Sequence, residues 1–112
     1  MNVFQLDGHT VNSSFDREYT ENMLRSFLAM AQAFNQPGFE TMNEDEQKDI
    51  LNYFYEKPIP SPDTDKEQDF KLKDPIMFQS ETDEKIVINA VGGQWYVLLE
   101  RDLLSFNPPE IP

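Results

Sequence analysis

The stretch Ile86-Val-Ile-Asn-Ala-Val91-Gly92-Gly93-Gln94-Trp-Tyr-Val-Leu-Leu99 decides the fold of this chain. Two runs rich in β-branched and aromatic residues flank a Gly-Gly pair, which is a strong signal for a two-residue hairpin turn. Such a turn pairs Val91 with Gln94, and because opposed side chains share a face, one face of the hairpin is wholly apolar. That face consists of Ile86, Ile88, Ala90, Trp95, Val97 and Leu99.

The opposite face of this predicted hairpin is mixed in character. A register slip of one residue would destroy the sorting of the two faces, so the pairing is well specified. We therefore expect the apolar face to pack on helices and the mixed face to be at least partly solvated. The mixed face consists of Val87, Asn89, Val91, Gln94, Tyr96 and Leu98.

The first predicted helix spans residues 14–34. Apolar residues recur there at steps of three and four, which places them in one broad stripe. Ser13 and Asp16 have the spacing of a capping box, which predicts a helix start close to Ser13. Pro37-Gly38 then ends this helix.

The second predicted helix spans residues 44–56. Asn43 is its cap residue, and the acids of the first turn lie where the helix dipole favours negative charge. The next segment, 58–75, has prolines at 58, 60 and 62, which exclude a helix, and a run of charges. We expect it to be a flexible acidic loop over the surface, with a short edge strand at 70–72.

Two shorter signals complete the expected sheet. Asp7-Gly8 is a favourable hairpin turn between short flanks in residues 2–11, and residues 76–79 form a further candidate strand. The predicted fold class is α+β, in which two N-terminal helices pack on a small antiparallel β-sheet. The sheet comprises the C-terminal hairpin 86–99 plus one or two further strands. The length of 112 residues predicts a single domain, 1–112.

The charge of the chain limits the classes of partner. It has 21 acidic and 9 basic side chains, giving a net charge of −12. This charge repels nucleic acid phosphates and anionic lipid headgroups, and it attracts basic proteins. No apolar run is as long as a membrane span, and the start of the chain lacks the features of a signal peptide. We therefore expect a cytoplasmic protein that binds neither membranes nor nucleic acid directly, with its oligomeric state left open.

Catalytic and metal-binding patterns are weak. The chain has no Cys and one histidine, His9, beside a predicted turn, so thiolate chemistry is excluded and a catalytic triad has little basis. The alternating acids of 63–69 suggest a calcium loop of the EF-hand type. However, position six is Gln68 where glycine is needed, and position twelve is Asp74 where glutamate is needed. Pro62-Asp63 and Asp69-Phe70-Lys71 have the letters of a nuclease motif, but they lie too close together for two strands and a turn. We expect no cofactor, no metal and no enzymatic activity.

Binding chemistry has better support than catalysis. Tyrosines near clustered acids suit an interface with a cationic protein, because aromatics supply buried anchors and carboxylates steer and pair. The alternative is that the tyrosines belong to the core and the acids only to solvent. The predicted partner-binding residues are Glu44, Asp45, Glu46, Asp49, Tyr53, Asp63, Asp65, Glu67, Asp69 and Tyr96.

These features predict a stoichiometric protein inhibitor. The leading hypothesis is a bacterial immunity protein or antitoxin that neutralises a cationic toxin, such as a nuclease, by covering its active or nucleic-acid-binding surface. One alternative is a phage-encoded inhibitor that imitates DNA with rows of carboxylates. A second is a small metal-dependent hydrolase that uses the acids of 63–69. A third is a subunit of a larger assembly, which requires a contiguous exposed apolar patch.

Overall fold

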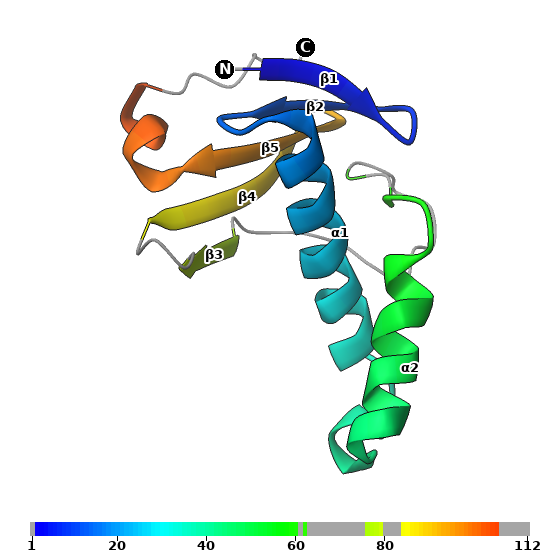
Figure 1. Cartoon of the computed structure of the whole chain (residues 1–112). Helices are drawn as coiled ribbons and strands as arrows, with labels where there is room; N and C mark the ends of the chain where they lie inside the picture. Colours follow the sequence, from blue (N-terminus) through cyan, green and yellow to red (C-terminus); the bar gives the residue numbers. More distant parts are fainter. Residues whose placement is uncertain (1, 61, 63–75, 80–83, 106–112) are drawn as a thin grey trace.

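The computed structural model describes residues 2–60, 62, 76–79 and 84–105. Its elements confirm the α+β class, although a β-hairpin precedes the helices (Figure 1). The order along the chain is β1 (Asn2–Leu6), β2 (His9–Ser13), α1 (Arg17–Phe34), the 3-10 turn η1 (Phe39–Thr41), α2 (Glu44–Tyr55), β3 (Ile76–Gln79), β4 (Lys85–Val91), β5 (Gln94–Leu99) and the 3-10 turn η2 (Glu100–Ser105).

The C-terminal hairpin has the predicted register. Val91 pairs with Gln94, Ala90 with Trp95, and the pairing continues to Ile86 with Leu99. The N-terminal hairpin is also confirmed, because Asp7 and Gly8 both have the positive φ that a type I′ turn requires, at 51° and 82°. Both turns therefore follow from local sequence alone.

The sheet is mixed, so the expectation of an antiparallel sheet is wrong. Its five strands have the order β1-β2-β5-β4-β3, and β2 runs parallel to β5 with Val11 opposite Trp95. The free edge of β5 accepts β2 because the helices and the segment after them supply the long crossover that a parallel pair needs. The N-terminal hairpin thus extends the sheet beyond β5.

Helix α1 begins later than the predicted residue 14. Its N-cap is Asp16, whose carboxylate accepts the Tyr19 backbone N–H at 2.8 Å. The expected capping box from Ser13 does not form. Instead, the Ser13 hydroxyl accepts the Phe15 N–H at 2.9 Å and lies 2.6 Å from the Thr20 hydroxyl, where both side chains are buried. Ser13 therefore joins the end of β2 to the first turns of α1.

The main core lies between α1 and one face of the sheet. The apolar hairpin face predicted from the sequence packs there against the leucines of α1. Ile59, in the chain after α2, also lies in this core at 3% exposure. The predicted surface loop 58–75 therefore has one buried residue near its start, while residues 63–75 and the strand expected at 70–72 lie outside the described residues. The buried members are Leu6, Val11, Leu24, Leu28, Ile59, Ile86, Ile88, Trp95 and Val97.

A second, smaller core joins α2 to α1 away from the sheet. It contains Ala29 and Ala33 of α1 with Phe39 and Phe54. Helix α1 has 18 residues and is therefore about 27 Å long, so its C-terminal half projects past the sheet (Figure 1). The small alanine side chains let α2 approach this half closely. The prediction that both helices pack on the sheet is thus wrong for α2, which forms an arm with α1.

The mixed face of the hairpin is more buried than expected. Tyr96 is 3% exposed, and Val87 and Leu98 are 2% exposed each, so the placement of Tyr96 on a solvated face is wrong. The Tyr96 hydroxyl donates to the Gln94 side-chain oxygen at 3.1 Å, and Asn12 donates to the same oxygen at 2.8 Å. The three large apolar or aromatic side chains of this face are thus buried, although polar residues share the face with them. Tyr96 is therefore removed from the candidate binding surface.

Burial also raises the pKa of the Tyr96 phenol above its ordinary value of 10.0. The folded state consequently holds this proton to higher pH than the unfolded state does. The stabilisation is complete below pH 10 and is lost as the pH rises through the raised pKa. We expect the free energy of unfolding to fall above pH 10 in the wild type and to fall less in Tyr96→Phe. Urea titrations at pH 8 and pH 11 measure both slopes, and equal losses in the two proteins would contradict the assignment.

Candidate protein-binding surface

The N-terminus of α2 is capped by Asn43, whose side chain makes two hydrogen bonds with Glu46. The Asn43 side-chain oxygen accepts the Glu46 backbone N–H at 2.9 Å, and the Asn43 side-chain NH2 group donates to the Glu46 carboxylate at 2.7 Å. Glu44 and Asp45 lie in the same first turn, where the helix dipole stabilises their charges. The local sequence therefore fixes the start of α2 and concentrates carboxylates there.

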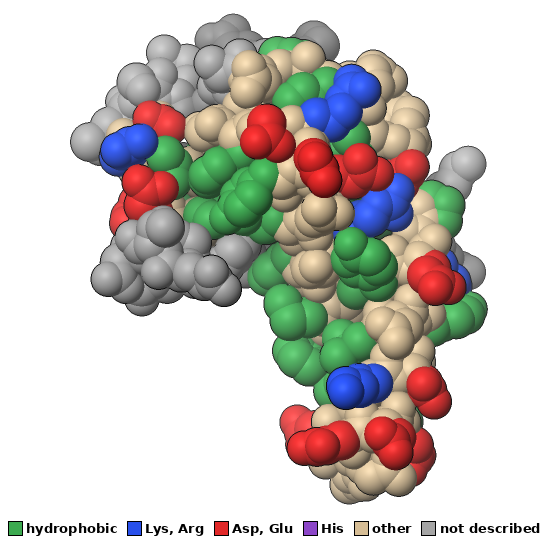
Figure 2. Space-filling model, viewed as in Figure 1, with side chains coloured by type: hydrophobic (Ala, Val, Ile, Leu, Met, Phe, Trp, Pro, Cys, Tyr) green, Lys and Arg blue, Asp and Glu red, His purple; other side chains and the backbone are tan. Residues whose placement is uncertain are grey.

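Four of the predicted residues share one exposed side of α2. Asp45, Asp49 and Tyr53 follow at steps of four, which aligns them along the helix, and Glu46 lies beside them. All four are exposed, and Tyr53 keeps 57% of its surface in contact with solvent. We call these four residues the acidic α2 face. Figure 2 shows the acidic side chains gathered at the tip of the arm.

Tyr53 already holds a cation on its ring. The Lys57 ammonium lies 4.3 Å from the Tyr53 ring centroid, within the range of a cation–π interaction. Lys57 is exposed, so this contact is open to exchange with a cation from outside. The ring and its acidic neighbours thus form a surface that suits a guanidinium or an ammonium group.

The remaining predicted residues do not join this surface in the described part of the chain. Glu44 is exposed in the same first turn but belongs to another side of the helix. Tyr96 is buried in the sheet. Asp63, Asp65, Glu67 and Asp69 lie outside the described residues. The acidic α2 face is therefore the part of the prediction that the structure brings together.

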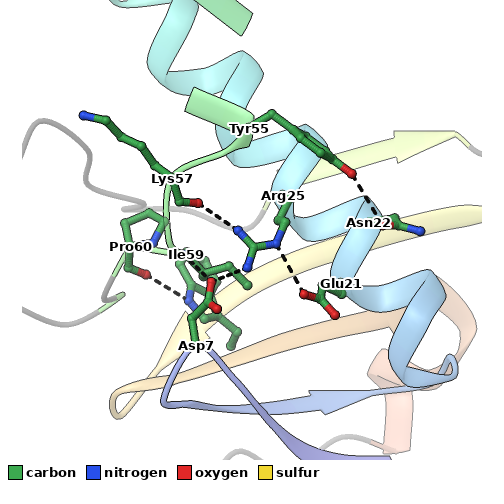
Figure 3. A network of polar contacts seen from close by, with 9 residues as sticks. Asp7, Glu21, Asn22, Arg25, Tyr55, Lys57, Ile59 and Pro60 are labelled. Atoms are coloured by element: carbon green, nitrogen blue, oxygen red, sulfur yellow. Dashed lines mark hydrogen bonds and ion pairs between the residues drawn. The ribbon is translucent and has the colours of Figure 1, made fainter. Parts of the chain in front are cut away.

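A junction that the sequence did not predict joins the arm to the sheet (Figure 3). Its centre is Arg25 of α1, which forms an ion pair with Asp7 in the β1–β2 turn and a weaker one with Glu21 at 3.4 Å. The Arg25 guanidinium also donates to the Lys57 carbonyl at 2.8 Å. One side chain thus links the N-terminal hairpin, α1 and the end of α2.

The chain after α2 is fastened at the same junction. The Asp7 carboxylate accepts the Ile59 N–H at 2.8 Å, and the indole of Trp95 donates to the Pro60 carbonyl at 3.2 Å. Breaking a hydrogen bond of a partly buried backbone group costs free energy, because the group is left without a partner. The direction of the arm relative to the sheet is therefore held by polar contacts as well as by the two cores.

Other candidate chemistry is sparse in the described ranges. These ranges contain no group of three or more His, Cys, Asp or Glu side chains that could hold a metal ion. A shallow pocket of about 210 Å³ lies at one end of β4 and β5, next to η2. Its charged side chains pair weakly, since Lys85–Glu100 and Arg101–Glu84 are both 3.9 Å apart. The acidic α2 face is a more distinctive surface than this pocket.

Within the described residues, neither helix has the length and apolar character needed to cross a lipid bilayer.

Comparisons with known proteins give no relative from which a function is transferred. Protein-family models, curated proteins and solved structures were all compared with this chain, and none of them matches it.

Proposed function

We propose that this protein is a stoichiometric inhibitor that binds a basic protein, in the manner of an immunity protein or antitoxin. The acidic α2 face carries the proposal, because it presents Asp45, Asp49 and the exposed Tyr53 on an arm that projects from the sheet. The partner is a cationic toxin, such as a nuclease. Inhibition consists of covering its active or nucleic-acid-binding surface, with no covalent step.

The charge and the shape of the arm support this proposal in different ways. A net charge of −12 speeds the encounter with a cationic protein. The second core and the Arg25 junction hold α2 in place before binding, so little ordering entropy is lost when the partner arrives. Tyr53 is a rigid aromatic anchor of the kind that dominates the binding energy of interfaces.

Reversing two charges on the acidic α2 face tests the proposal. We expect Asp45→Lys/Asp49→Lys to slow association with the basic partner by about tenfold or more at low salt, and less at high salt. Both side chains are exposed, so the free energy of unfolding should fall by no more than about 1–2 kcal/mol, most of it from the loss of the favourable interaction of Asp45 with the helix dipole. Stopped-flow binding to the product of the adjacent gene, together with urea unfolding, measures both quantities.

The matched control is Glu84→Lys/Glu100→Lys, which changes the net charge equally at the far end of the sheet. This control should slow association much less, since its charges lie away from the arm. Equal slowing by both variants would make the effect one of total charge and would remove the acidic α2 face from the interface. Absence of a complex in size-exclusion chromatography, with no protection of cells from that gene product, would end the proposal.

A further inference from the structure

Strand β1 forms one margin of the sheet, and no strand in the described part of the chain pairs with its outer edge (Figure 1). The inner edge of β1 pairs with β2, which in turn pairs with β5. The side chains of β1 are accessible, because Asn2 and Gln5 are exposed and Val3 is 64% exposed. An open edge presents a row of backbone N–H and C=O groups with which a further strand can pair.

The register of the N-terminal hairpin shows which backbone groups lie on this outer edge. In a two-residue hairpin the residues that flank the turn form a hydrogen-bonded pair, here Leu6 with His9. Hydrogen-bonded and non-hydrogen-bonded pairs then alternate along an antiparallel ladder. Phe4 is therefore bonded to β2, whereas the N–H and C=O groups of Val3 and Gln5 point outward.

The other side of the same hairpin supports this alternation. Ser14, directly after β2, donates its N–H to the Val97 carbonyl at 3.0 Å and thus faces β5. Backbone groups alternate in direction along a strand, so Asn12 faces β5 as well. Asn12 is the residue opposite Val3, and its backbone groups are directed away from β1. The N–H and C=O groups of Val3 are therefore directed to the outer edge.

Strand β1 lacks the features with which proteins block an open sheet edge. Natural edge strands carry charged side chains, prolines or bulges that prevent further pairing. The sequence of β1, Asn-Val-Phe-Gln-Leu, has neither a charge nor a proline. Its pairing with β2 runs through consecutive residues and has no bulge. In a chain of which 27% of the residues are charged, this edge is suited to accept another strand.

The charge around β1 favours a second copy of this chain as the source of that strand. Residues 2–17 contain two acids, Asp7 and Asp16, and one base, Arg17. Asp7 also forms its ion pair with Arg25. Nearly all of the net charge of −12 therefore lies outside this segment. Two copies that meet through β1 bring few charges together, whereas a cationic protein is attracted to the acidic α2 face.

We infer that β1 pairs antiparallel with β1 of a second copy, so that two five-stranded sheets join into one. The strand is self-complementary about Phe4. Val3 of each copy lies opposite Gln5 of the other, and this register uses all the outward N–H and C=O groups of both residues. The contact has two-fold symmetry, so it closes after two copies and does not extend into a fibre.

The side chains of β1 suit this pairing on both faces of the sheet. Phe4 is half-buried against the main core, and the register places the two Phe4 residues directly opposite each other. Aromatic residues in this position stabilise antiparallel strands. On the other face, the exposed Val3 packs against the Gln5 side chain of the second copy and loses contact with water. The resulting dimer carries two arms and therefore two acidic α2 faces.

Amide hydrogen exchange of the full chain, measured by NMR at about 20 µM and about 1 mM protein, tests the inference without a variant. We expect the Val3 and Gln5 amides to exchange about fivefold more slowly, or slower still, in the dimer, because the second strand accepts their N–H groups. The Phe4 and Leu6 amides are the internal control and should exchange slowly in both states, since they bond to β2. Sedimentation equilibrium of the same samples identifies monomer and dimer.

Two results of the exchange measurement would overturn the inference. Protection of Val3 and Gln5 in a sample that sediments as the 13.1 kDa monomer would identify residues of the same chain, such as 106–112, as the occupant of the edge. A dimer in which both amides exchange as fast as in the monomer would place the contact elsewhere. A sample that stays monomeric at both concentrations would also overturn the inference.

Two variants of one residue separate pairing through this edge from other association. Gln5→Pro removes the outward N–H, whereas Gln5→Thr keeps it, and both lose the side-chain hydrogen bond to Thr10 at 3.2 Å. We expect Gln5→Pro to weaken dimerisation by about tenfold or more and Gln5→Thr to change it by less than about threefold. Circular dichroism confirms that each variant is folded. Equal dimerisation constants would overturn the inference, and exchange in the wild type decides the question if the proline variant does not fold.

Salt dependence keeps the dimer apart from the proposed function, which uses another surface. Raising the NaCl concentration from about 50 to about 500 mM should strengthen the dimer, because it screens the remaining repulsion between two chains of net charge −12. The same change should weaken binding of the basic partner. A dimer that forms while the partner does not bind leaves the inference standing and ends the proposed function. Protection of Val3 and Gln5 only after the partner is added would identify a partner strand as the occupant and overturn the inference.

Discussion

Trp95→Ala should destabilise the protein by about 3–5 kcal/mol, a large part of the 5–15 kcal/mol that typically stabilises a domain of this size. Trp95 is fully buried at the middle of the sheet, with Val11 opposite it on β2 and Ala90 opposite it on β4. Removing the indole leaves a cavity between the sheet and α1 and leaves the Pro60 carbonyl without its donor. Urea unfolding followed by circular dichroism measures the loss.

Two further variants interpret that result. Trp95→Phe keeps most of the buried area but lacks the N–H, so we expect an intermediate loss. Val3→Ala, on the edge strand β1 where Val3 is 64% exposed, should change the free energy of unfolding by less than about 0.5 kcal/mol. A loss below 1 kcal/mol for Trp95→Ala would contradict the placement of the indole in the main core.

Leu28→Ala should cost about 2–5 kcal/mol. The Leu28 side chain is 1% exposed and lies in the main core, where α1 meets the sheet. Alanine has a favourable helix propensity, so the loss measures packing and not helix formation. Thermal unfolding and urea unfolding of the same samples give two independent values.

The matched control for this variant lies half a turn further along the same helix. Met30 is 40% exposed, and Met30→Ala should cost less than about 1 kcal/mol. The difference between the two variants therefore reports which side of α1 faces the sheet. Comparable losses of stability at both positions would contradict the structure, in which Leu28 faces the main core and Met30 is exposed.

Local patterns in the sequence predict both hairpins and the start of α2 because the interactions that decide them are close in the chain. Gly92-Gly93 fixes the register of β4 and β5, and Asn43 fixes the start of α2 through a residue three positions away. The parallel pairing of β2 with β5 joins residues more than 80 positions apart, at Val11 and Trp95. The short, polar sequence of β2 gives no sign of which strand it joins.

The sequence pattern also does not predict where α2 packs. An apolar periodicity identifies the buried sides of α1, but it does not say whether a sheet or a helix covers each side. Ala29 and Ala33 look no different from Ala31 in the sequence, although two of them contact α2 and Ala31 packs on the main core. The same limit explains the wrong prediction for Tyr96. It shares a face of the hairpin with the polar Asn89 and Gln94, and this predicted exposure to solvent.

The sequence predicts the part of the candidate site that lies within a single helix. Asp45, Asp49 and Tyr53 belong to one helix, and their spacing of four residues already aligns them. The Arg25 junction depends on Asp7 and on the Lys57 carbonyl, which tertiary structure brings together. An arginine on the polar side of a helix carries no sign of such partners.

The division of α1 between two cores has an evolutionary consequence. Residues 35–55 contact mainly the alanine half of α1, while the sheet depends on its leucine half. Substitutions in the distal segment are therefore insulated from the folding of the sheet. Natural variation, or a mutagenesis library, can diversify the exposed positions of this segment with little effect on the packing of the sheet.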